Sequence, residues 1–197
     1  MKRGFSRAEL ATYADAGVPD LVGPDPRLVF VGINPGLWTA ATQTHFAHPG
    51  NRFYPALRLA GIIDREIDRG VGLTEQDRTY LLERGLGNTN LVNRATIRAD
   101  ELGDDELRAG RLRLEEFAAR HHPRVLAVAG VTAYRTAFGR PRARVGEQPE
   151  GLLGARLWVV PNPSGLNAHE TIASLAAAYA EPARAAGILP EPVLDAG

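Results

Sequence analysis

The amino-acid sequence predicts an α/β fold of three layers, αβα, around a short and mainly parallel central sheet. Short, nearly all-apolar runs recur along the 197 residues, and helical patterns lie between them. Apolar runs of this length are typical of strands that are buried on both faces. Their alternation with helices favours a parallel sheet that helices cover on both sides.

The individual elements follow in chain order. Ser6 and Glu9 have the spacing of a capping box, which predicts a first helix from Ser6 to about Asp15. Glycines and prolines between 17 and 26 then predict a linker. The strand candidates are 28–33, 89–92, 125–129 and 157–160, and the helical patterns lie near 52–61, 74–84, 104–121, 131–138 and 168–180.

The length predicts one domain that spans residues 1–197. We expect an N-terminal helix and linker at 1–27, a core at 28–185 and a tail at 186–197. The chain has no apolar stretch long enough for a membrane span, and its first ten residues lack the apolar segment of a signal peptide. These features predict a cytoplasmic protein.

Charge and cysteine content exclude several classes of function. The chain has 23 basic and 23 acidic residues, so it is not globally basic as many nucleic-acid-binding chains are. The absence of cysteine excludes disulfides, a thiol nucleophile, an iron-sulfur cluster and cysteine-based zinc sites. Lys2 is the single lysine, which argues against a buried Schiff-base lysine. We expect no cofactor and no metal.

Positive charge is nevertheless concentrated in one part of the chain. Residues 107–146 contain nine Arg and two Glu, and this stretch ends in the arginine-rich segment 140–144. Such a segment can follow a phosphate backbone. Arginines on helices are more often solvated or paired with carboxylates, so this observation only supports an argument made elsewhere.

Ligands of open α/β sheets bind outside the carboxyl ends of the strands. This rule selects the segments 34–51, 93–98, 130–132 and 161–169. The first segment overlaps Gly32-Ile33-Asn34-Pro35-Gly36, which has neither the spacing of a phosphate loop nor that of GxGxxG. The Asn34 amide both donates and accepts, which suits a nucleobase or a positioned water. The alternative is a structural turn.

The stretch His45 to Tyr54 mixes aromatic and polar residues on a segment that begins as a loop. An aromatic ring there can stack on a base, and Arg52 can meet a phosphate. His45 and His48 are three residues apart, but no acidic residue or third histidine lies near them. Ordinary hydrogen-bonded histidines are therefore favoured over a metal site.

Leu166 stands in a loop of Gly, Ser and Asn residues directly after the fourth strand candidate. One interpretation is a side chain that folds back on the core as a staple for the next helix. The other is an exposed wedge that enters a base stack, as apolar side chains do in proteins that kink DNA.

Together these segments resemble the mismatch-specific uracil-DNA glycosylase and thymine-DNA glycosylase family, within the uracil-DNA glycosylase superfamily. Residues 32–36 resemble its first active-site motif, residues 46–53 its FAHPxNRF continuation, and Asn162-Pro163-Ser164-Gly165-Leu166 its insertion-loop motif. The similarity runs from about Leu28 to Ala185. Three motifs in this order at strand ends are far more specific than any one of them alone.

The resemblance implies hydrolysis of the N-glycosidic bond of a mispaired or damaged base that is flipped out of duplex DNA. It implies that Asn34 holds the attacking water and that Leu166 fills the space left by the base. Gly165 and Asn167 would face the base left on the other strand. The implied base-binding residues are Ile33, Gly36, Thr39, Phe46 and Asn93, and the implied DNA-binding residues are Ser164, Gly165, Leu166, Asn167, His48, Asn51 and Arg52.

Residue chemistry adds limits to this expectation. An amide is a very poor proton acceptor, so Asn34 can position water but cannot act as a general base, and we expect a slow enzyme. Without an internal lysine, the enzyme is expected to be monofunctional and to leave an intact abasic site. Thr39, placed by similarity near C5 of the base, would crowd a thymine methyl, so uracil opposite guanine should be released faster than thymine. Ethenocytosine and deaminated purines stay open as further substrates.

Asn93 departs from several members of the family, which carry an acidic residue at this position. We do not assign it the role of a base, and our hypothesis is that Asn93→Asp raises the rate. The iron-sulfur branch of the superfamily is excluded because this chain has no cysteine.

Two further interpretations stay open. One is a lesion-binding protein of the same fold that does not cleave, and the other is a nucleotide-binding α/β domain unrelated to DNA. The expected partners of a glycosylase are double-stranded DNA that carries a mismatched or damaged base, and downstream enzymes that repair abasic sites. We expect a monomer.

Overall fold

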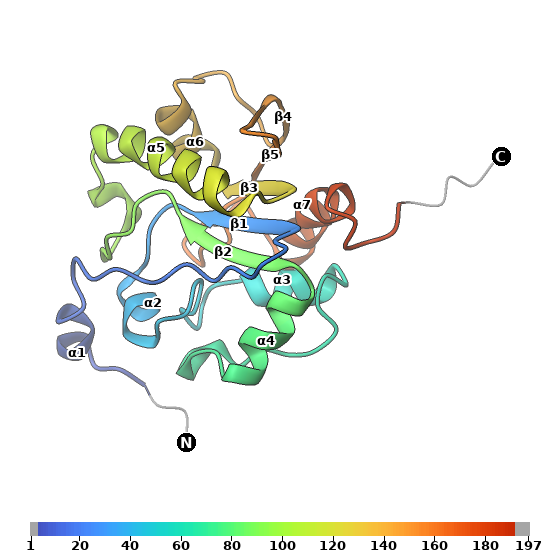
Figure 1. The fold of residues 1–197 in the computed structure, drawn as a ribbon. Helices are drawn as coiled ribbons and strands as arrows, with labels where there is room; N and C mark the ends of the chain where they lie inside the picture. The colour runs from blue at the N-terminus through green and yellow to red at the C-terminus, as the bar shows by residue number, and fades with distance from the viewer. Residues whose placement is uncertain (1–3, 192–197) are drawn as a thin grey trace.

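A five-stranded sheet forms the centre of the fold in the computed structural model, which describes residues 4–191 (Figure 1). The strand order is β2-β1-β3-β5-β4; β1 pairs in parallel with β2 and β3, β3 pairs in parallel with β5, and β4 is antiparallel to β5. The strands are β1 (Leu28–Gly32), β2 (Leu86–Asn90), β3 (Val125–Ala129), β4 (Gly146–Leu152) and β5 (Ala155–Val160). The predicted mainly parallel sheet is confirmed.

Helices cover both faces of this sheet, as the predicted αβα layering requires (Figure 1). Side chains alternate between the faces along each strand. Phe30 packs with residues of α3 and α7, while Val29 and Val31 pack with residues of α5 and α6. The helices are α1 (Arg7–Ala11), α2 (Leu37–Thr42), α3 (Phe53–Leu59), α4 (Glu75–Glu83), α5 (Asp104–His121), α6 (Val131–Phe138) and α7 (Ile172–Ala185), with short 3₁₀ turns at Arg69–Val71 and Ala99–Glu101.

Strand β2 begins three residues earlier and ends two residues earlier than the apolar run 89–92 that predicted it. Its sequence, Leu-Gly-Asn-Thr-Asn, is poor in apolar residues, yet every residue in it is buried. The cause is the N-terminal segment 15–21, called the strap below, which crosses β2 and pairs Leu21 with Asn88. A Cβ at Gly87 would lie 2.8 Å from the Leu21 carbonyl oxygen, so this crossing needs a glycine.

Two elements were not predicted at all. Helix α2 begins directly after Pro35-Gly36, a pair that suggested a continuing loop. Strand β4 contains Pro149 and is largely exposed, because it lies at the edge of the sheet where a missing N–H is tolerated. Helix α7 begins at Ile172, later than the expected 168, because Thr171 and Ser174 form its capping box.

Carboxylates balance part of the positive charge in the arginine-rich stretch 107–146. Five of its nine arginines form ion pairs, which join Arg108 to Asp104 and Asp105, Arg111 to Glu115, Arg113 to Asp20, Arg124 to Asp25, and Arg140 to Glu150. In Figure 1 the connection between α6 and β4 runs over the top of the molecule. These five ion pairs reduce the excess of positive charge in this stretch, whereas Arg142 and Arg144 form no ion pair with the described residues.

The two ends of the chain lie partly outside the described residues. Lys2 and the tail from 192 to 197 fall there, while Ala186, Ile188 and Leu189 at the start of the tail pack on the core. Within residues 4–191, none of the helices combines the length and the apolar character that crossing a membrane requires.

Candidate active site

A pocket lies where β1, β2 and β3 end, at the edge of the sheet that the sequence selected. Its volume is about 160 Å³, close to that of an engineered cavity of about 150 Å³ that holds one benzene ring. The pocket therefore has room for a single six-membered ring. It is lined by Gly32, Ile33, Asn34, Gly36, Thr39, Phe46, Asn51, Asn90, Thr96, Ile97, Arg98, Ala99, Ala129, Asn162, Ser164 and Leu166.

The amide of Asn34 is held in one orientation at this pocket. Its Nδ2 donates to the Arg94 carbonyl oxygen at 2.8 Å and to the Thr96 hydroxyl at 2.7 Å. A carbonyl oxygen only accepts, so the nitrogen of the amide must face Arg94. Oδ1 of Asn34 accepts no hydrogen bond from any residue in the described part of the chain. The amide thus presents an acceptor at a pocket of ring size.

The segment that holds Asn34 is itself anchored from behind. The Arg94 guanidinium donates to both carboxylate oxygens of Glu106 on α5, at 2.8 and 3.0 Å, and to Asp15 at 3.0 Å. These hydrogen bonds from Arg94 lower the pKa of Glu106. Thr96 donates its hydroxyl to the Arg98 carbonyl oxygen, which leaves the Thr96 oxygen free to accept from Asn34. The orientation of Asn34 is therefore set by residues that follow β2.

Phe46 forms an aromatic wall of the pocket. Its ring stacks on Phe53 with centroids 4.1 Å apart and planes inclined by 26°. The backbone of Phe46 has a positive φ of 57°, which is a strained conformation for a bulky residue. Gly32 lies beside this ring: a Cβ there would touch the Phe46 ring at an ordinary contact distance of 3.5 Å but would collide with Oδ1 of Asn90 at 2.4 Å. The contact with Phe53 holds the Phe46 ring at the pocket.

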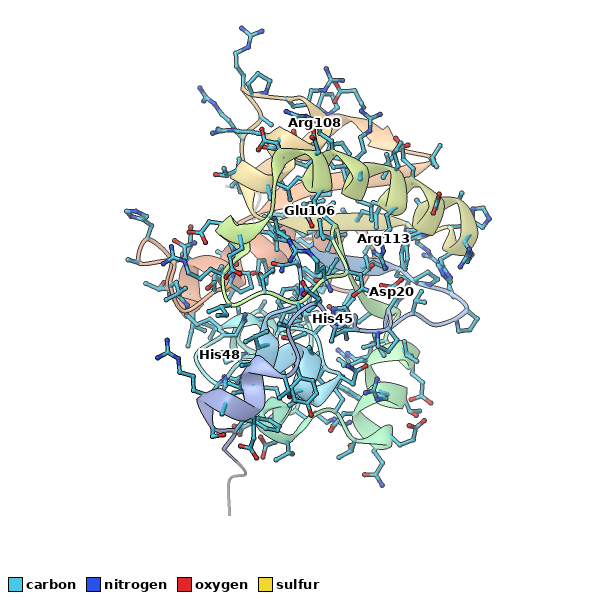
Figure 2. All side chains as sticks on the ribbon, turned by 90° about the vertical axis from the view of Figure 1, so that its left-hand side faces the viewer. Asp20, His45, His48, Glu106, Arg108 and Arg113 are labelled. Carbon is cyan, nitrogen blue, oxygen red and sulfur yellow. The ribbon has the colours of Figure 1, made fainter. Side chains whose placement is uncertain are left out.

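Asn90, the last residue of β2, brings a second buried amide to the pocket. Its Nδ2 lies 3.3 Å from Nδ1 of His45, and its Oδ1 is the atom next to Gly32. His45 is buried, and burial lowers its pKa, which favours the neutral ring. Arg113 on α5 donates to the Asn90 carbonyl oxygen at 2.5 Å and to Asp20 of the strap (Figure 2). The end of β2 is therefore fixed on both sides.

Leu166 is 82% exposed at the rim of the pocket. The interpretation of this leucine as a staple on the core is therefore wrong. Hydrogen bonds between near neighbours in sequence hold the loop that carries Leu166. The Ser164 N–H donates to Asn162 Oδ1, and Asn167 Nδ2 donates to the Asn162 carbonyl oxygen. Ile97, which is 73% exposed, is a second apolar residue at the same rim.

Arg52 joins the two loops on either side of the rim. Its guanidinium donates to the carbonyl oxygens of Ser164, Asn167 and Glu170, and its backbone N–H donates to Pro163. These contacts engage the guanidinium inside the protein, where it shapes the loop 161–169. A Cβ at Gly165 would lie 2.6 Å from the Gly50 carbonyl oxygen, so the two loops touch only because residue 165 is glycine.

A wider apolar groove of about 570 Å³ adjoins the pocket and shares Gly36, Ile97, Ser164 and Leu166 with it. Leu10 of α1 and Trp38 of α2 line the groove with His48. His48 accepts the Gly50 N–H at its Nδ1, and partial desolvation and the charge of Arg69 lower its pKa. In Figure 2 His48 lies to the left of His45, toward the N-terminal helix.

The pocket lining holds no carboxylate, histidine or lysine among the described residues, and Arg98 is its one charged residue. Arg98 is paired with Asp100 at 2.6 Å. Within residues 4–191, no group of three or more His, Asp or Glu residues is placed so that it could hold a metal ion. The available chemistry is therefore that of amides, backbone groups and an aromatic ring.

The structure brings most of the predicted site residues together. Ile33, Asn34, Gly36, Thr39, Phe46, Asn51, Ser164 and Leu166 line the pocket, and His48 and Gly165 line the groove beside it. Arg52 and Asn167 lie within the loop contacts described above. Asn93 does not line the pocket: it is exposed, and its Oδ1 accepts the Val18 N–H at 2.8 Å.

Four polar residues of the pocket were not assigned as site residues from the sequence. They are Asn90, Thr96 and Arg98, and Asn162, which was named only as part of the insertion-loop motif. Thr96 and Arg98 lie in the segment 93–98, which the strand-end rule selected without naming them. Asn90 was missed because β2 ends at residue 90 instead of 92. A polar residue at the end of a buried strand was the signal that could have found it.

Comparison with known proteins identifies a family and a common fold. The family model described as the uracil DNA glycosylase superfamily matches residues 19–182. A solution NMR structure described as a "putative Uracil DNA glycosylase" from Methanosarcina acetivorans aligns with a TM-score of 0.56 at 18% sequence identity. The alignment covers 88% of this chain and 98% of that chain, and it shows a common fold.

Proposed function

We propose that this chain, which belongs to the uracil DNA glycosylase superfamily, hydrolyses the N-glycosidic bond of uracil mispaired in duplex DNA and leaves an abasic site. Membership of this family supports DNA glycosylase activity in general. The mismatch preference and the mechanism are our proposal. The observation that carries it is the Asn34 amide, whose nitrogen is fixed by Arg94 and Thr96 so that Oδ1 is available at a ring-sized pocket.

In the proposed reaction Asn34 Oδ1 accepts a hydrogen bond from a water molecule and aims its oxygen at C1′ of the deoxyribose. The water oxygen bonds to C1′ as the C1′–N1 bond breaks, and the bond's electron pair leaves with the base. The water proton passes to solvent or to the departing base. Because the pocket lining offers no general base, the rate depends on how well the base carries negative charge. Uracil, an electron-poor base, is therefore favoured over cytosine.

Recognition of the flipped base is proposed to use Phe46 and Asn90. One face of the base stacks on the Phe46 ring, which its contact with Phe53 holds in place. Oδ1 of Asn90 accepts a hydrogen bond from N3–H of uracil, a donor that cytosine lacks. Thr39, which lines the pocket and is buried, limits the space for a methyl group at C5. A methyl group changes binding in a tight pocket by about 1–3 kcal/mol, so thymine should be released more slowly.

The exposed Leu166 is proposed to enter the base stack when the uracil leaves it. An apolar wedge compensates part of the unstacking energy of a few kcal/mol per step. Gly165 and Asn167 stand beside it, where the resemblance expects contact with the base on the other strand. The product, an abasic site in an unbroken strand, must then be incised by an enzyme of another class.

The proposal is tested by single-turnover base release from end-labelled duplexes that carry U·G, U·A, T·G or no lesion. We expect release from U·G to be fastest, release from T·G to be at least about tenfold slower, and strand breaks to form only after alkali. Strand breaks without alkali would contradict the monofunctional mechanism, and equal rates on U·G and T·G would contradict the role of Thr39.

The same experiment separates the competing interpretations. Tight binding to U·G duplex without release from any substrate would favour a lesion-binding protein of this fold. Absence of duplex binding at low salt would favour a nucleotide-binding domain unrelated to DNA, because phosphate contacts strengthen as salt falls. Size-exclusion chromatography of the complex tests the expected monomer.

A further inference from the structure

We propose that His45 is a positioning residue that fixes the orientation of the Asn90 amide and thereby makes the pocket select a base with an N3–H donor. This inference rests on the proposed function for its consequence but on the protein's own hydrogen bonds for its geometry. The relay runs from the strap to the pocket through the Pro19 carbonyl, the His45 ring and the Asn90 amide.

The first step of the relay fixes the tautomer of His45. Nε2 of His45 lies 3.1 Å from the Pro19 carbonyl oxygen. That oxygen has no proton to donate, so Nε2 must carry the hydrogen. In a neutral imidazole the other nitrogen, Nδ1, is then a bare acceptor. The strap therefore decides which nitrogen of this buried ring accepts.

The second step fixes the Asn90 amide. Nδ1 of His45 lies 3.3 Å from Nδ2 of Asn90, and an acceptor at Nδ1 requires the amide nitrogen, not its oxygen, to face the ring. Oδ1 of Asn90 then points to the other side, next to Gly32 at the pocket floor. A side chain at residue 32 would collide with this oxygen, so Gly32 is part of the same arrangement.

The consequence is a choice between bases. An Oδ1 acceptor matches N3–H of uracil and opposes the bare N3 of cytosine. If the amide turned over, Nδ2 would face the pocket and would match cytosine instead. Free rotation of Asn90 would therefore weaken the discrimination, because an amide that can turn suits either edge. Discrimination by buried hydrogen bonds is strong only where the polar groups cannot adapt.

Protonation of His45 would reverse the relay, because a proton on Nδ1 turns the acceptor into a donor. Burial lowers the pKa of His45, which favours the neutral ring. The charged groups around the ring are Asp20 of the strap, Arg113 of α5 and Arg78 of α4. From α3 the Tyr54 hydroxyl donates to the His45 carbonyl oxygen. Asp20 favours the charged ring, and the two arginines oppose it.

The tautomer can be measured without DNA. We expect long-range ¹H–¹⁵N NMR of protein labelled at histidine to show, near neutral pH, a protonated Nε2 and an unprotonated Nδ1 for His45. A proton on Nδ1, or a charged ring, would overturn the proposal. This measurement stands even if the proposed glycosylase activity fails, because it reads the hydrogen bonds of the free protein.

The selectivity is tested with 5-fluorouracil and 5-fluorocytosine opposite a tetrahydrofuran abasic analogue, so that pairing does not differ and both bases leave readily. Replacement of His45 by leucine removes the acceptor at Nδ1. His45→Leu should reduce the ratio of the two single-turnover rates about tenfold through a slower release of 5-fluorouracil, an effect of the size of one hydrogen bond. If His45→Leu slowed the release of both bases equally, His45 would have a merely structural role and the proposal would be overturned.

A conservative variant keeps the test decisive if His45→Leu folds poorly. His45→Asn can place an oxygen acceptor where Nδ1 stood, so we expect it to retain the discrimination within about twofold of the wild type. Loss of discrimination in a folded His45→Asn protein, with the wild type discriminating, would also overturn the proposal. Wild-type protein that releases neither base would instead refute the proposed function, and the tautomer measurement would still decide the relay.

Discussion

The two walls of the pocket differ in how their functional groups are held. The motif wall, residues 33–51 with the loop 161–169, supplies Asn34, Phe46 and Leu166. The back wall, residues 90–98, supplies Asn90 and Thr96 and carries no recognisable motif. Yet Arg94 and Thr96 of the back wall orient Asn34 of the motif wall. The motif wall therefore provides the group that reacts with the substrate, while the back wall fixes the direction of that group.

A substitution at the rim of the motif wall should reduce activity more than one in the back wall. Leu166→Ala should lower kcat/KM on U·G duplex by at least about tenfold, because unstacking a base costs a few kcal/mol and the wedge compensates part of it. Leu112→Ala on α5 is the matched control, since Leu112 is also exposed but far from the loop in sequence. Single-turnover kinetics at subsaturating enzyme measure both. Equal effects of the two substitutions would remove Leu166 from the mechanism.

The back wall should affect the rate through Asn34. Thr96→Val deletes the hydroxyl that accepts from Asn34 Nδ2, and the loss of one hydrogen bond of about 1 kcal/mol should slow release roughly fivefold. Thr96→Ser keeps the hydroxyl and should stay within about twofold of the wild type. The single-turnover rate constant is the measurement. A normal rate in Thr96→Val would mean that Arg94 alone orients the amide.

Beyond the back wall, Asn93 should matter for stability and not for catalysis. Asn93→Ala removes the acceptor of the Val18 N–H and should lower the free energy of unfolding by about 1 kcal/mol. Because Asn93 lies outside the pocket, we expect Asn93→Asp to leave the rate unchanged, in place of the increase that the sequence suggested. Urea denaturation and single-turnover rates test the two statements. A faster Asn93→Asp enzyme would restore the sequence-based hypothesis.

The smallest effect should be a pH dependence of stability. Burial lowers the pKa of His45 in the folded protein below the ordinary value of about 6.5. The unfolded chain therefore takes up the proton first as pH falls, and stability is lost from about pH 6.5 down to the folded pKa. Compared with the wild type, His45→Leu should show a shallower loss of unfolding free energy over this range. If the unfolding free energies of the two proteins fell in parallel with pH, His45 would not be a buried, neutral group in the folded protein. His48, whose pKa is also lowered, contributes equally to both proteins.

The sequence predicted the fold and much of the motif wall, because apolar runs indicate buried strands and the motifs can be recognised by residue type. Apolar runs located β3 without error, and the motifs placed Asn34, Phe46 and Leu166 at strand ends. The back wall could not be predicted in the same way. Strand β2 is buried by the strap and not by its own apolar residues, so its end was misplaced and Asn90 with it.

The direction in which a polar side chain points is the second feature that the sequence pattern could not predict. Arg52 resembles a phosphate contact in sequence, but its guanidinium is engaged by three carbonyl oxygens of the neighbouring loop. Asn34 and Asn93 both follow strands, yet one amide faces the pocket and the other faces the strap. These differences arise from partners more than forty residues away in the chain.

The central claim is that Asn34 positions the water and does not hold the DNA. The most direct test compares wild type with Asn34→Ala on a U·G duplex, with single-turnover release and duplex affinity measured on the same preparations. The account predicts that release falls by about a hundredfold or more, the cost of a badly placed reactant, while affinity changes less than about threefold. A normal rate, or a loss of rate that follows a loss of affinity, would contradict it.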